Sequence, residues 1–232
     1  NELNVTTQLD NIDIQLPASL GKSTTLPKSL DLTASFAPGR DMSISFISDN
    51  HMTGKINYQQ QLINTINLTF EQLDIFAQNY QQLNAHVQAT TDGWQLTLNA
   101  EQVEGVLDIP RDNTKSINAK FSKLIVDTHE TSLSDESRDI VPGNLPPIHL
   151  TIDHFIHNNK RLGQLELVTQ PADETLEIVK LKLNAESFQV HAVGPWQKLE
   201  TGSQTTLKGY FLSEQFAKTL ADKKPQNIKL LY

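Results

Sequence analysis

The chain has 232 residues, a formal net charge of −8 and no cysteine, and 38% of its residues are hydrophobic. The negative charge argues against a nucleic-acid partner, which requires a basic surface, and against adsorption to an anionic membrane by charge. The lack of cysteine in the sequence excludes disulfides, thiolate metal sites and cysteine nucleophiles.

Apolar and polar residues alternate along most of the chain, starting near the N-terminus. The alternating stretches lie at 3–9, 12–16, 30–36, 42–46, 66–70, 83–89, 94–109, 117–121, 148–152, 165–167, 176–185, 188–192 and 207–211. A period of two residues is typical of strands with one buried and one solvated face. The stretches recur at intervals of about 8–12 residues, which is typical of all-β proteins. The low hydrophobic fraction fits such half-solvated strands.

Residues 93–110, GWQLTLNAEQVEGVLDIP, follow this pattern with one interruption. Apolar side chains occupy every second position from Trp94 to Ala100, and the alternation then resumes one residue out of phase at Val103. This shift predicts either two strands or one bulged strand.

Helical patterns are scarce. The segment SEQFAKTLADKK has a plausible N-cap at Ser213 and a short apolar stripe at Phe216, Ala217 and Leu220, so we expect one short helix near the C-terminus. Residues 71–83 fit either a helix or a strand–turn–strand unit, and an internal repeat favours the second.

Three pairs of fragments resemble one another. Residues 73–83 match 152–162, residues 96–105 match 181–190, and residues 66–73 match 117–124. The first two pairs keep the same order, which indicates a repeated multi-strand unit and an elongated structure. We therefore predict one continuous segment over 1–232, with repeat units at about 66–127 and 148–220 and a flexible loop at 128–147.

Candidate catalytic and metal-binding residues are few. The sequence LGKSTT ends like a phosphate-binding loop, but Leu16 stands where that motif needs glycine. A possible metal-binding set consists of three histidines around Asp153: His149, His154 and His157. The strand pattern instead favours a solvated polar face for these residues. No nucleophile elbow, HExxH motif or dinucleotide-binding turn is found. We therefore expect no enzyme activity, no metal and no cofactor.

A series of short motifs in the second half of the chain resembles a known family. GW-x-L-x-L, G-x-L-x-I-P, a P-x-x-L strand, LG-x-L-x-L and G-P-W stand at 93–98, 105–110, 147–150, 162–167 and 194–196, and T-x-L-x-G follows from Thr206. In this order they resemble the later part of the YhdP-type members of the AsmA-like family, related to TamB. The resemblance covers about 66–232; Pro195 departs from the family pattern, and we expect it to disturb strand pairing.

The resemblance implies a long, twisted, antiparallel-type sheet that curls into an elongated open groove, and no enzymatic activity. It implies a periplasmic protein of Gram-negative bacteria, anchored in the inner membrane by a segment outside this chain. Relatives are linked to phospholipid movement between the two membranes. Since the chain begins within an alternating run and stops at NIKLLY, which reads as the start of a strand, we expect it to be a piece of a larger protein.

The expected partner is a phospholipid or another acyl-chain lipid, held by apolar side chains of alternating strands. The predicted lining residues are Leu96, Leu98, Leu107, Phe121, Leu150, Ile152, Leu165, Leu167, Leu181, Leu183, Phe188 and Val190. Two other readings stay open at this point: a closed β-sandwich or barrel that binds a protein or sugar, and a structural spacer.

Overall fold

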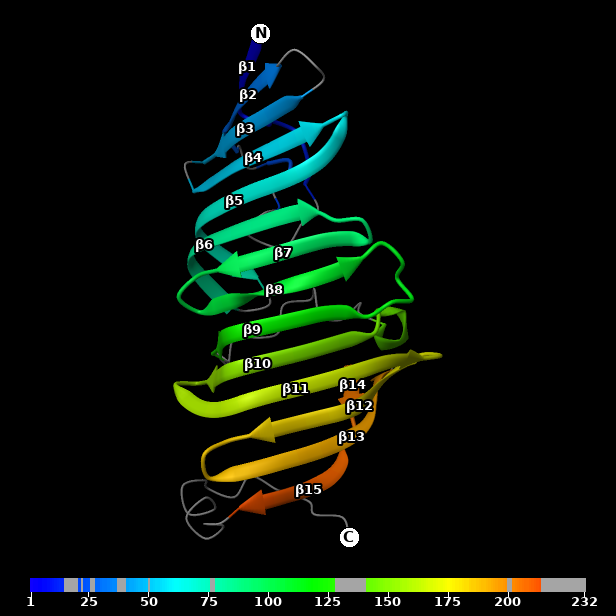
Figure 1. Ribbon diagram of the computed structural model, residues 1–232. Helices are drawn as coiled ribbons and strands as arrows, with labels where there is room; N and C mark the ends of the chain where they lie inside the picture. Colours follow the sequence, from blue (N-terminus) through cyan, green and yellow to red (C-terminus); the bar gives the residue numbers. More distant parts are fainter. Residues whose placement is uncertain are drawn as a thin grey trace.

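The described strands form one sheet that extends along the whole molecule (Figure 1). The computed structural model describes residues 1–14, 21, 23–25, 28–36, 41–49, 51–75, 78–127, 141–199 and 202–213. The strands lie across the long axis and follow one another from the N-terminus to the C-terminus (Figure 1). The predicted all-β class is confirmed.

The first half of the sheet contains nine strands. They are β1 (Glu2–Thr7), β2 (Leu30–Phe36), β3 (Met42–Ser48), β4 (Met52–Gln59), β5 (Leu62–Ile75), β6 (Gln78–Ala89), β7 (Gly93–Asn99), β8 (Val103–Pro110) and β9 (Ile117–Val126). The phase shift within 93–110 therefore marks two strands, β7 and β8, joined by a short turn. Residues 71–83 contain the end of β5 and the start of β6, so the strand–turn–strand prediction is confirmed there.

The second half begins with a 3₁₀ turn and continues with six strands. These are η2 (Pro142–Asn144), β10 (Ile148–His157), β11 (Lys160–Ala172), β12 (Thr175–Asn184), β13 (Phe188–Leu199), β14 (Gly202–Thr205) and β15 (Lys208–Ser213). Of the predicted loop 128–147, residues 128–140 lie outside the described residues, and η2 occupies part of the remainder. The predicted C-terminal helix also lies outside the described residues.

Neighbouring strands are antiparallel throughout, with one exception. Among the described strands, only β9 and β10 pair in parallel, over Ile117–Val126 and Ile148–His157, so the sheet is of the expected antiparallel type with one parallel pair. A parallel pair needs a connection long enough to return the chain to the same end of the sheet, usually a dozen or more residues. The connection between these two strands, 127–147, meets that requirement.

The outer edge of β13 pairs with two strands in succession. β15 pairs with residues 188–193 of β13, and β14 pairs with residues 196–199. The change of partner falls at Gly194 and Pro195, where φ of Gly194 is +149°. Proline has no amide hydrogen for a ladder bond, and pairing at this outer edge is interrupted at Pro195 as expected, while on the other edge Pro195 stays in register with Glu177 of β12.

The sheet forms a single layer in the described part of the chain. Its strands pack mainly against their neighbours in the sheet, and η2 packs against β11, β12 and β13. The strands are not closed into a barrel, so the closed sandwich or barrel reading is wrong. The open arrangement is consistent with the predicted open groove. No helix among the described residues is long and apolar enough to cross a membrane.

Two of the three pairs of similar fragments fall on corresponding elements of the fold, whereas 66–73 and 117–124 lie on β5 and β9, which do not correspond. Residues 73–83 and 152–162 cover the β5–β6 and β10–β11 turns, and residues 96–105 and 181–190 cover the β7–β8 and β12–β13 turns. The two similar runs therefore occupy meanders of four strands each, β5–β8 and β10–β13.

Candidate functional site

One face of the sheet carries two unbroken rows of apolar residues, which we call row 1 and row 2. Residues directly opposite one another in a ladder point to the same face, so the strand registers define each row. Row 1 is Val5, Leu32, Phe46, Gly54, Leu68, Ala85, Leu98, Gly105, Phe121, Ile152, Leu165, Leu183, Val190 and Phe211. Row 2 is Leu3, Ala34, Ile44, Ile56, Ile66, Val87, Leu96, Leu107, Ala119, Leu150, Leu167, Leu181, Ala192 and Gly209.

The two rows lie two residues apart on every strand, so they share one face, which we call the apolar face. Each row contains one residue from each of β1–β13 and from β15. No member of either row has a polar side chain. With ~4.8 Å between neighbouring strands, each row follows a path of about 60 Å along the sheet.

The residues between the two rows point to the opposite, polar face. They are Asn4, Thr33, Ser45, Lys55, Asn67, His86, Thr97, Val106, Lys120, Thr151, Glu166, Lys182, His191 and Tyr210. Val106 is the one aliphatic member of this set. The two faces therefore differ in chemistry along the whole length of the sheet.

Cross-strand hydrogen bonds connect side chains on the polar face. The Thr33 hydroxyl donates to Asn4 Oδ1 over 2.8 Å, and Lys180 Nζ donates to Glu166 Oε1 over 2.7 Å. The Lys180 bond, with its charge, holds the pKa of Glu166 below its usual value. The rings of His191 and Tyr210 stack with centroids 4.7 Å apart. This network explains why the solvated face needs no apolar cover.

Most members of rows 1 and 2 remain partly exposed. The buried members are Ala34, Ala85, Ala119, Ile152 and Ala192, four of which are alanines sheltered by larger neighbours. The larger side chains are shielded by adjacent strands and, over most of the sheet, meet no facing layer of described residues. Contiguous apolar surface of this extent on a protein marks a binding surface.

All twelve residues predicted to line a groove lie on the apolar face. Leu98, Phe121, Ile152, Leu165, Leu183 and Val190 belong to row 1, and Leu96, Leu107, Leu150, Leu167 and Leu181 belong to row 2. Phe188 lies two residues before Val190 on the same face, and its ring stacks on that of Phe211 at 5.4 Å. The structure brings the set together; contact with a lipid stays a prediction.

The end of the β5–β6 hairpin bends over one margin of the apolar face. We call its residues, 71–75 and 78–82, the overhang. Leu73 is buried with Phe70, Leu83 and Val103, and this cluster packs against the row 1 residue Phe121, among others. The overhang thus covers the apolar face locally, at β7 to β9, and Figure 1 shows the hairpin end passing behind these strands.

Two reciprocal hydrogen bonds fasten the overhang to the end of β9. Gln78 Nε2 donates to the carbonyl oxygen of Asp127, and the Asp127 amide donates to Gln78 Oε1, each over 2.8 Å. The Gln81 amide also donates to Gln102 Oε1 over 3.3 Å. Tyr80, within the overhang, packs against the buried cluster, and this burial raises the pKa of its hydroxyl. The overhang is therefore an ordered wall on one side of the apolar face.

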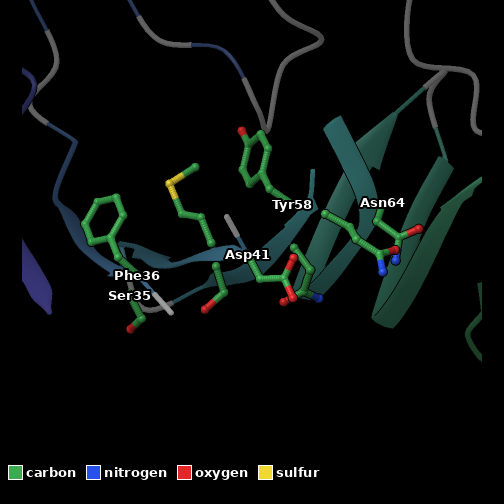
Figure 2. A pocket seen from close by; sticks show the side chains of 9 residues that line it. Ser35, Phe36, Asp41, Tyr58 and Asn64 are labelled. Carbon is green, nitrogen blue, oxygen red and sulfur yellow. The ribbon is translucent and has the colours of Figure 1, made fainter. Parts of the chain in front are cut away.

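A shallow depression of about 440 Å³ lies at the margin of the apolar face on β2 to β5. Phe36, Met42 and Tyr58 are register partners and extend the apolar face into it. In Figure 2 the rings of Phe36 and Tyr58 rise from the strands, and Asp41 lies below Tyr58. Asp41 is the one charged residue in its lining.

The sequence motifs with catalytic or metal-binding potential do not converge in the described structure. His149 Nε2 lies 3.8 Å from Glu166 Oε1 on the polar face, and His154 and Asp153 are exposed. No group of three or more histidine, aspartate or glutamate residues that could hold a metal ion occurs among the described residues. Of the LGKSTT segment, part lies outside the described residues.

The fold and its apolar face define a class of protein: an open, single-layered sheet with a continuous hydrophobic surface on one side. A family model described as YhdP protein matches residues 44–230. The chain belongs to the YhdP family, an AsmA-like, lipid-transport-related family that is not a known class of enzyme. Comparison with curated proteins and with solved structures gave no match.

Several site residues escaped the sequence-based selection. The N-terminal members of the rows, such as Leu32, Phe46 and Ile56, continue the apolar face beyond the twelve predicted residues. Their alternation was visible in the sequence and could have identified them. The overhang could not be found in this way, because its position depends on contacts between residues far apart in the chain.

Proposed function

We propose that the apolar face carries the acyl chains of phospholipids. The single observation that supports this proposal best is the unbroken pair of rows, in which no polar side chain occurs over fourteen successive strands. An acyl chain has no hydrogen-bonding group, so it needs a surface of this composition and no catalytic residue.

The energetics suit movement along the face. Each methylene group sheltered from water contributes ~0.8 kcal/mol, so an acyl chain of about sixteen carbons gains ~12 kcal/mol when fully covered. Extraction from a bilayer costs a similar amount, and the apolar face offsets the part of this cost that belongs to the side of the chain lying on the sheet. Since the rows offer similar chemistry at each strand, no position along them holds the chain much more tightly than the next.

The family resemblance extends the proposal to the whole protein. In it, this chain is a periplasmic segment of an inner-membrane-anchored protein that moves phospholipid between the inner and outer membranes. The headgroup stays in water beside the sheet while the tails lie on rows 1 and 2. The polar face, with its side-chain hydrogen bonds, meets the aqueous periplasm.

Lipid binding is tested with the purified chain. Native mass spectrometry identifies lipid that co-purifies, and fluorescence titration with a phosphatidylcholine carrying an NBD label on one acyl chain measures affinity. We expect bound phospholipid and a blue-shifted NBD emission from an apolar site. A chain that carries no lipid and leaves the probe unshifted would support the structural spacer instead.

A further inference from the structure

Row 1 contains two glycines, and each is the register partner of a phenylalanine on the next or preceding strand. Gly54 on β4 pairs with Phe46 on β3, and Gly105 on β8 pairs with Phe121 on β9. Glycine in a strand interior weakens it and often marks a close approach by another group. In this structure, the approaching group is the side chain of the paired phenylalanine.

The Phe46 ring lies across Gly54. A Cβ atom placed on Gly54 would lie 2.9 Å from Phe46 Cε2 and closer still to Cζ and Cε1, whereas ordinary van der Waals contacts of Cβ atoms are 3.4–4 Å. These are the distal atoms of the ring, so the side chain reaches over its partner strand and does not stand upright. The flat ring covers the glycine backbone and fills the place of the missing side chain.

Gly105 is also approached by its phenylalanine partner, but through a proximal ring atom and the backbone of β9. A Cβ atom there would collide with Phe121 Cδ1, and would also lie 2.6 Å from the Lys120 carbonyl oxygen and 2.8 Å from Phe121 Cα. The Phe121 ring belongs to the packing below the overhang. At this covered part of the apolar face, Gly105 therefore lets the Phe121 ring pack closely against β8 beneath the buried cluster.

We infer that Gly54 is a positioning residue that keeps the ring of Phe46 flat, and so sets the free height above the apolar face for an acyl chain. This inference rests on the proposed function. Any side chain at Gly54 forces the Phe46 ring away from the sheet and into the path of the lipid tail. The ligand class that such a floor admits is a linear acyl chain.

Gly54 provides the cleaner test of the two, because the three nearest atoms to its virtual Cβ all belong to the Phe46 ring. Gly54→Ala therefore displaces a side chain, whereas Gly105→Ala also strains the backbone of β9. We expect Gly54→Ala to weaken binding of the NBD-labelled phosphatidylcholine by about tenfold, equivalent to about two methylene groups displaced from the face.

A double-mutant cycle separates obstruction by the ring from a general defect in the strand. Phe46→Ala removes the ring, so Phe46→Ala/Gly54→Ala should bind the probe within about twofold of Phe46→Ala. Thr53→Ala, on the polar face of β4, is the matched control and should bind like the unmodified chain. Circular dichroism and urea unfolding establish that each variant is folded.

The outcomes distinguish the inference from the proposed function. If the unmodified chain and Gly54→Ala bind the probe with equal affinity, the inference is overturned and the proposed function stands. The inference is also overturned if Gly54→Ala lowers the affinity equally in the unmodified chain and in Phe46→Ala, because the ring would then play no part. Failure of the unmodified chain to bind would overturn the proposed function and this inference with it.

Discussion

A negative charge placed on the apolar face should block lipid binding without unfolding the sheet. Leu183 is a suitable position because it lies in row 1 between Leu165 and Val190, outside the buried cluster beneath the overhang. Its side chain is partly exposed, so a glutamate there reaches water when no lipid is bound. Leu183→Glu therefore leaves the strand ladder of β11, β12 and β13 intact.

The expected loss of affinity follows from the protonation of the new carboxylate. An acyl chain that covers this position must displace water from the charge or force it to take up a proton. With a glutamate pKa of about 4.3, protonation at pH 7 costs about 3.7 kcal/mol, at 1.36 kcal/mol per pH unit. Binding of a tail that covers the position should thus fall by up to about 500-fold, and recover by about tenfold for each unit of pH decrease toward 4.3.

Titration with NBD-labelled phosphatidylcholine at pH 7 and pH 5 measures both effects. Leu183→Gln keeps the shape without the charge and should lose less affinity, independently of pH. Gln189→Glu, exposed on the polar face of β13, should bind like the unmodified chain. Unchanged affinity of Leu183→Glu, or an equal loss in Gln189→Glu, would contradict the assignment of the apolar face as the binding surface.

The overhang and the polar face lead to three further expectations. Gln78→Ala removes both reciprocal hydrogen bonds to the end of β9 and should lower the free energy of unfolding by about 1–3 kcal/mol, measured by urea denaturation. Amide hydrogens of residues 78–82 should also exchange faster. Unchanged exchange rates would contradict the role of Gln78 in holding the overhang. Leu73→Ala leaves a cavity in the buried cluster and should lower the free energy of unfolding by about 2–5 kcal/mol in the same urea denaturation. The control Leu62→Ala, on the same strand at a residue that is 73% exposed, should change it by less than about 0.5 kcal/mol. The hydrogen bond from Lys180 is the main cause of the lowered pKa of Glu166. Its stabilisation of the folded state is therefore present above the ordinary glutamate pKa and is lost as the pH falls through the lowered pKa. Lys180→Met should raise the pKa of Glu166 in an NMR titration, and an unchanged pKa would exclude the bond in solution.

The strands and their faces could be predicted because a single layer encodes burial with a period of two. The phase shift between Ala100 and Val103 located the β7–β8 turn, and alternation assigned Leu150 and Leu167 to the same face as their neighbours. A parallel sheet covered by helices on both faces would contain strands buried on both sides, for which the period of two is weaker.

Strand direction and partner could not be predicted in the same way. Local alternation is identical for parallel and antiparallel neighbours, so the parallel β9–β10 pair depends on the path of 127–147 and not on a pattern in either strand. The roles of Gly54 and Gly105 were hidden for a related reason, since each depends on which phenylalanine lies opposite. The overhang is a third case, because Phe70 and Leu73 join one cluster despite their odd spacing, which requires a bend in the strand.

A sheet whose strands touch mainly their immediate neighbours has a linear distribution of stability. Its unfolding free energy is approximately a sum of nearest-neighbour terms, as in repeat proteins, so the terminal strands should fray first and interior strands last. Damage at one strand then weakens the ladder on either side without melting the remainder. Local loss of order at one strand therefore leaves the apolar face of distant strands intact.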